Sequence, residues 1–104
     1  MNTNDRMINL YNQGKFSIAT AKNMRISEDS ICNFIGECIQ NVLLNEQNNE
    51  ARSEYVFEIL ANNIKDLDMR IFNIALQKMK SHIIVRSEGV LKCNRVVLPP
   101  NSAW

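Results

Sequence analysis

Apolar side chains recur along most of the chain at the three- and four-residue spacing of a helix, and the pattern changes only near the C-terminus. The longest stripe runs from Ile31 to Val42 and predicts a helix over about 28–44. The same spacing predicts shorter helices over about 4–13, 17–24, 54–62 and 67–81. Serine and aspartate oxygens can accept hydrogen bonds from the N–H groups of a first helical turn. The expected caps are Ser27 for the helix over 28–44, Ser53 for the helix over 54–62 and Asp66 for the helix over 67–81.

From residue 82 onward, the sequence is typical of β-strands. Residues 82–86 and 90–98 are rich in β-branched side chains and flank a Ser87-Glu88-Gly89 turn, which predicts an antiparallel hairpin. The predicted fold class is therefore mainly α, a helix-turn-helix bundle with a C-terminal β-hairpin, and a winged helix is one form that it could take.

The polar run at 45–50 divides the chain into two parts. Residues 1–45 form the expected helix-turn-helix unit, residues 51–98 a helical unit with a basic β-hairpin, and residues 99–104 a tail. At 104 residues, we expect the two units to share one core.

Composition narrows the class of protein. The chain has 45% apolar and 22% charged residues, and it contains no run of the roughly 20 apolar residues that crosses a bilayer. Its first residues lack the features of a secretory signal, so we expect a cytoplasmic protein with no membrane partner. The three cysteines show no metal-ligand spacing, and we expect free, buried thiols, no metal site and no cofactor.

Positive charge is concentrated in the second half of the chain, although the net charge is only +1. Residues 1–50 hold four basic and six acidic residues, a balance of −2, whereas residues 51–104 hold eight and five, a balance of +3. Because affinity for nucleic acid grows with the number of phosphates neutralised, this distribution matters more than the total.

A helix-turn-helix pattern spans residues 14–31. Ala21 is small enough for two helices to cross closely, Met24 and Ile26 bracket the turn, and Ser27 caps the next helix. With these features, residues of about 5–45 resemble the DNA-binding unit of LuxR-type transcriptional regulators. The resemblance implies that the helix over 28–44 enters the major groove.

Arg25 stands where such motifs usually have a turn glycine. An arginine there must accept a left-handed or similarly rare backbone conformation, unless the turn is longer.

The resemblance also implies which residues of the first unit face DNA: Lys15, Lys22, Arg25, Ser27, Asp29, Ser30 and Asn33. Asn33 could read adenine, and Asp29 or Glu28 could read cytosine. Acidic residues are also what a helix dipole favours in a first turn. A structural or protein-binding role for this helix is therefore an equal alternative.

A second candidate surface lies in the helix over 67–81, where polar side chains 3, 4 and 3 residues apart line one face: Arg70, Asn73, Gln77 and Lys80. The hairpin that follows carries Arg86, Lys92 and Arg95. A helix followed by a basic hairpin resembles a winged helix, in which the helix reads the major groove and the hairpin contacts the backbone or minor groove. The alternative is a solvated helix face and an edge hairpin protected by its charges.

No catalytic triad, phosphate-binding glycine loop or pair of carboxylates in a plausible cleft emerges, so we expect no enzyme and no catalytic residue. The leading hypothesis is a sequence-specific transcriptional regulator that binds double-stranded DNA, with a homodimer as one arrangement that would suit paired half-sites. The first alternative is a small inhibitor or adaptor, of the phage or mobile-element kind, that binds another protein. A weaker one is an oligomeric assembly factor.

Overall fold

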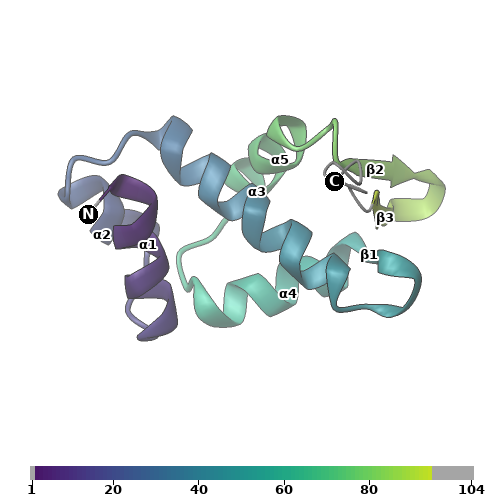
Figure 1. Ribbon diagram of the computed structural model, residues 1–104, viewed down its shortest axis with the longest axis horizontal. Helices are drawn as coiled ribbons and strands as arrows, with labels where there is room; N and C mark the ends of the chain where they lie inside the picture. The colour runs from purple at the N-terminus through teal and green to yellow at the C-terminus, as the bar shows by residue number, and fades with distance from the viewer. Residues whose placement is uncertain (1, 95–104) are drawn as a thin grey trace, which may run out of the picture.

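The computed structural model describes residues 2–94, and in that range five helices and a small antiparallel sheet follow one another along the chain (Figure 1). The helices are α1 (Thr3–Asn12), α2 (Ile18–Asn23), α3 (Glu28–Leu44), α4 (Ser53–Asn63) and α5 (Met69–Lys78). The strands are β1 (Glu50–Arg52), β2 (Ile83–Arg86) and β3 (Val90–Cys93). The predicted class, mainly helical with a C-terminal hairpin, is confirmed.

The long helix α3 forms the centre of the molecule. It crosses the middle of Figure 1, with α1 and α2 at one end and the sheet at the other. Its stripe of Ile31, Ile35, Ile39 and Leu43 is fully buried. One hydrophobic cluster joins this stripe to side chains of every other helix and of the hairpin, so α3 supplies core to both parts of the chain.

At Gly36, α3 packs tightly against α5 and the residue that follows it. A Cβ atom on Gly36 would lie 2.6 Å from Met79 Cγ and 3.2 Å from the carbonyl oxygen of Ala75. Only a residue without a side chain leaves room for the two helices at this distance. An edge-on contact between the rings of Phe57 and Phe72, 5.3 Å apart, holds α4 against α5.

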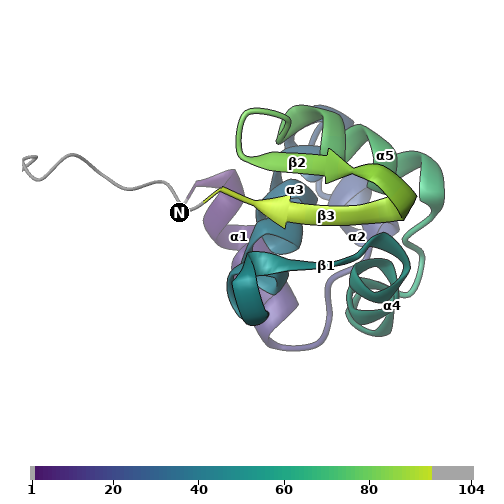
Figure 2. The same cartoon turned by 90° about the vertical axis from the view of Figure 1, so that its right-hand side faces the viewer.

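The sheet has the order β1-β3-β2, with both pairs antiparallel (Figure 2). Ile83, Leu91 and Cys93 are its buried side chains, and in Figure 2 the helices lie behind the strands. The hairpin β2–β3 was expected, but β1 was not. With only three residues, β1 has too little alternation to be recognised, and its pairing with Lys92 and its neighbours exists only in the folded chain.

From α3 onward, the elements follow in the order helix, strand, helix, helix and two-stranded hairpin. The helix-turn-helix pattern predicted from the sequence at residues 14–31 corresponds to α2 and the start of α3.

Two predicted caps are wrong. Ser53 is the first residue of α4, and the cap position before it, Arg52, makes no side-chain hydrogen bond to the helix. Asp68, rather than Asp66, caps α5 by accepting a hydrogen bond from the Ile71 N–H at 2.8 Å. The sequence offers two aspartates two residues apart, and only the packing of the turn decides which one faces α5. The helix also ends at Lys78 instead of 81.

The cap and turn around α3 agree with expectation. Ser27 accepts a hydrogen bond from the Ser30 N–H at 3.1 Å. Arg25 has the left-handed backbone conformation that its position requires, with a φ of 65°. The end of the predicted second strand, residues 95–98 with Arg95 among them, lies outside the described range. So does the tail at 99–104.

Candidate nucleic-acid interface

The outer face of α5 presents the polar side chains that the spacing predicts. Arg70, Asn73, Gln77 and, just past the helix end, Lys80 are all exposed. The inner face buries Ile71, Phe72 and Ala75 against the core. The 3.6-residue period places the two sets on opposite sides of the helix, and the Asp68 cap sets where the helix begins.

The first turn of α3 lies beside this face. Glu28 accepts two hydrogen bonds from the Arg70 guanidinium, at 2.9 and 3.3 Å, and a third from Lys22 Nζ at 3.2 Å. These hydrogen bonds, from Arg70 first and then Lys22, lower the pKa of Glu28 to about 2. The end of α2 and the start of α3 carry some of the DNA-facing residues predicted in the first unit. They thus lie beside the second candidate surface, on α5.

A second ion pair connects the same two helices. Asp29, in the first turn of α3, binds Lys78 of α5. Sequence reasoning missed Lys78 as well as both pairs, because the partners are 42 and 49 residues apart and no local pattern relates them. A carboxylate of α3 therefore faces each cation of this surface except Lys80.

The basic hairpin is also partly neutralised. Arg86 Nη1 lies 3.5 Å from Glu50 Oε1 on β1, and Lys92 Nζ lies 3.7 Å from the same oxygen. Lys92 in addition donates a hydrogen bond to the carbonyl oxygen of Asn48 at 2.8 Å. The unpredicted strand β1 thus places an acid beside two of the predicted DNA contacts.

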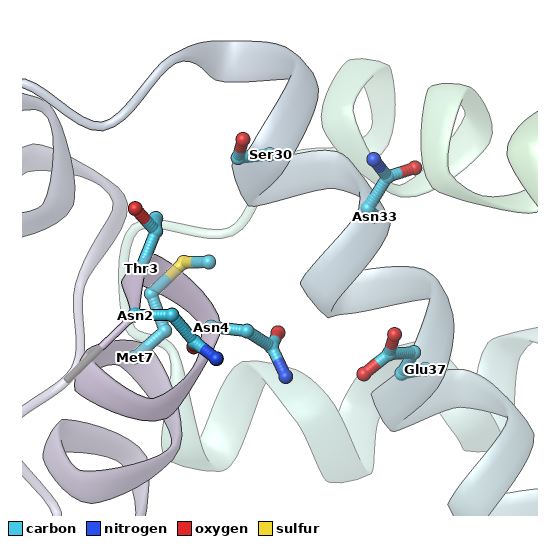
Figure 3. Close-up of a pocket in the computed structure, with 7 residues that line it drawn as sticks. All are labelled: Asn2, Thr3, Asn4, Met7, Ser30, Asn33 and Glu37. Atoms are coloured by element: carbon cyan, nitrogen blue, oxygen red, sulfur yellow. The ribbon is translucent and has the colours of Figure 1, made fainter.

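Two residues predicted as part of the leading edge of α3 lie on a different side. Ser30 and Asn33 line a pocket between α3 and the start of α1, together with Asn2, Thr3, Asn4, Met7 and Glu37 (Figure 3). At 100° per residue, Ser30 lies about 160° and Asn33 about 140° around α3 from Glu28, although Asn33 is only about 40° from Asp29. Among the described residues that line this pocket, Glu37 is the only charged one, and it is an acid.

The remaining predicted cations of the first unit, Lys15 and Arg25, are exposed. Within residues 2–94 neither has an ion-pair partner, and the same holds for Lys80 on the α5 surface. Of the predicted set, Lys22, Arg70, Asn73, Gln77 and Lys80 therefore form one candidate surface, whereas Ser30 and Asn33 belong to another.

Other kinds of site are not seen in residues 2–94. There, no group of three or more His, Cys, Asp or Glu side chains could hold a metal ion, and all three cysteines are buried free thiols. None of the described helices combines the length and apolar character needed to cross a bilayer. No protein-family model, curated protein or solved structure matches the chain.

Proposed function

We propose that the protein is a cytoplasmic, sequence-specific regulator of transcription that binds double-stranded DNA through the outer face of α5. The observation that carries this proposal is the exposed row of Arg70, Asn73, Gln77 and Lys80 on a helix followed directly by a hairpin. Arginine can bind guanine with two hydrogen bonds, and asparagine or glutamine can bind adenine in the same way. Lys80 and the hairpin cations then contact the phosphate backbone.

Burial favours α5 over α3 as the helix that reads bases. Eight residues of α3 are buried among the other helices and the sheet, and its first turn carries Glu28 and Asp29. By contrast, the outer face of α5 exposes the side chains of Arg70, Asn73 and Gln77 to solvent. The LuxR-type resemblance of residues 5–45 then describes a supporting unit, which contributes Lys22 at the edge of the surface.

The direct test measures fluorescence anisotropy of labelled duplexes, both random and selected from a random pool, over a series of salt concentrations. Asn73→Ala and Gln77→Ala should each weaken binding to the selected duplex by about 1–3 kcal/mol, because each removes a base contact. Lys80→Gln should weaken binding to all duplexes and reduce the slope against salt by about 1. Asn41→Ala, an exposed amide on α3, is the matched control and should have no effect.

Two results would contradict the proposal. Absence of binding at low salt, or binding that is indifferent to salt, would reject DNA binding. Loss of binding on replacing Asn33 and Lys22, with Asn73 and Gln77 without effect, would transfer the contact to the first unit.

A second candidate function is supported by exposed apolar side chains. Tyr55, Met69, Ile84 and Val85 are 46, 50, 44 and 64% exposed. Met69 also lines a pocket with Phe57, Ser53, Glu54 and Glu58 at the start of α4. Apolar surface of this kind suits a small inhibitor or adaptor that binds another protein. A pull-down from nuclease-treated host lysate tests this alternative, and loss of every stable protein partner under that treatment would count against it.

A further inference from the structure

The carboxylates on α3 and the cations on α5 bind each other at the surface proposed to bind DNA. Arg70 and Glu28 form a two-pronged pair, with one guanidinium nitrogen on each carboxylate oxygen. Lys22 binds one of the same oxygens, and Lys78 binds Asp29. Two neighbouring carboxylates of α3 thus bind three cations, one on α2 and two on α5.

We propose that Glu28 and Asp29 are internal competitors of DNA, which hold Arg70, Lys22 and Lys78 until base edges or phosphates displace them. This inference rests on the proposed function and adds the residues that control its strength and selectivity.

The competition follows from hydrogen-bond geometry. Arginine binds guanine or phosphate with the same paired N–H groups that it uses for a carboxylate. While Glu28 holds both Arg70 nitrogens, that pair of donors is not open to a base or a phosphate. The pair is exposed on both sides, with 60 and 39% of the two side chains open to solvent, so water and a competing anion can reach it.

The two carboxylates also act after displacement. They remain beside the bound DNA, where they repel phosphates, and this repulsion opposes every duplex to a similar degree. Random duplexes bind through phosphate contacts alone, whereas the selected duplex also gains contacts to Asn73 and Gln77. Glu28 and Asp29 therefore keep random binding weak and allow base contacts to decide where the protein binds.

A different geometry would predict the opposite result. If Glu28 held Arg70 in the orientation needed to read a guanine, its loss would weaken binding to the selected duplex. The sign of the change in affinity therefore separates a competitor from a positioning residue.

The test compares Glu28→Gln and Asp29→Asn with the wild-type protein and with Glu37→Gln, using anisotropy on random and selected duplexes. Each variant removes one negative charge from α3, but Glu37 lies on the side of α1 and has no ion pair to α5. Glu28→Gln and Asp29→Asn should each tighten binding to the random duplex by about three- to fivefold. Glu37→Gln should change it less. The plot of affinity against salt should become steeper only for the first two variants, because more phosphates are then neutralised.

Each result of this test either supports or overturns the inference. Equal gains for all three variants show a general effect of net charge and overturn the inference, as does weaker binding by Glu28→Gln. Binding by the wild-type protein that neither substitution alters overturns the inference and leaves the proposed function standing. If neither the wild-type protein nor any variant binds duplex, both fail. Thermal unfolding confirms that each variant is folded, and Asp29→Asn provides an independent measurement if Glu28→Gln proves unstable.

Discussion

Asp66 caps a helix that begins 48 residues before it in the chain. Its Oδ1 accepts a hydrogen bond from the Ile18 N–H at 2.8 Å, and its Oδ2 accepts one from the Ala19 N–H at 2.9 Å. Ser17 accepts the next N–H, from Thr20, at 3.0 Å. The first N–H groups of α2, which have no partner inside the helix, are thus satisfied. The turn between α4 and α5 is thereby joined to the N-terminal unit.

Removing the Asp66 carboxylate should destabilise the fold. Asp66→Ala is expected to lower the free energy of unfolding by about 1–2 kcal/mol, the usual cost of losing a cap, and Asp66→Asn by less because it keeps one acceptor. Urea denaturation measures the change. Glu58→Ala, an exposed acid on α4, is the control and should change stability by less than about 0.5 kcal/mol. An equal loss in the two alanine variants would show that the hydrogen bonds to α2 contribute nothing specific.

Gly36→Ala should also destabilise the protein, although alanine favours a helix by about 1 kcal/mol over glycine. The added methyl group would meet Met79 and force α3 and α5 apart, which usually costs about 1–3 kcal/mol. We expect a net loss of about 1 kcal/mol by chemical denaturation.

A double-mutant cycle tests the cause of that loss. Met79→Ala removes the closest of these contacts and leaves the Ala75 carbonyl oxygen at 3.2 Å, so Gly36→Ala should cost less in a Met79→Ala background than in the wild-type protein. The same loss in both backgrounds would mean that the clash with Met79 is not the reason.

The left-handed residue in the α2–α3 turn predicts an unusual preference for glycine. At Arg25, with its φ of 65°, glycine should be more stable than alanine by about 1 kcal/mol, since a Cβ atom is strained in this conformation. At Asn23, the last residue of α2, the order should reverse because glycine is unfavourable in a helix. Thermal unfolding of the four variants gives both differences, and the same order at both positions would refute the assigned turn.

The pair between Glu28 and Arg70 should make stability depend on pH. The pKa of Glu28 is lowered from 4.5 to about 2, chiefly by the Arg70 hydrogen bond, so folding favours the charged carboxylate. Its contribution is therefore fully present above pH 4.5 and is lost as the pH falls towards 2. The stability difference between the wild-type protein and Glu28→Gln should follow this course, and high salt should reduce it. A difference that stays constant from pH 6 to pH 2 would contradict the ion pair.

Helix positions were predictable from the sequence where a periodic apolar stripe was long. The stripe from Ile31 to Val42 predicted α3 almost to the residue, and Ser27 was its predicted cap. The left-handed conformation of Arg25 was one of two that the sequence left open. The spacing of polar side chains at three and four residues likewise predicted which side of α5 faces solvent. These features depend on neighbours within a few positions, and a local pattern records them.

Partners distant in the chain were decided by the tertiary structure alone. Nothing near Asp66 shows that it caps α2, and nothing near Glu28 shows that it binds Arg70. Strand β1 is equally hidden, because three residues form a strand only when β3 lies beside them. The sequence by itself determined the helices, the hairpin and the exposed row on α5. Only folding placed two carboxylates of α3 against the cations of that row, because an ion pair depends on distance in space, and spacing along the chain does not specify it.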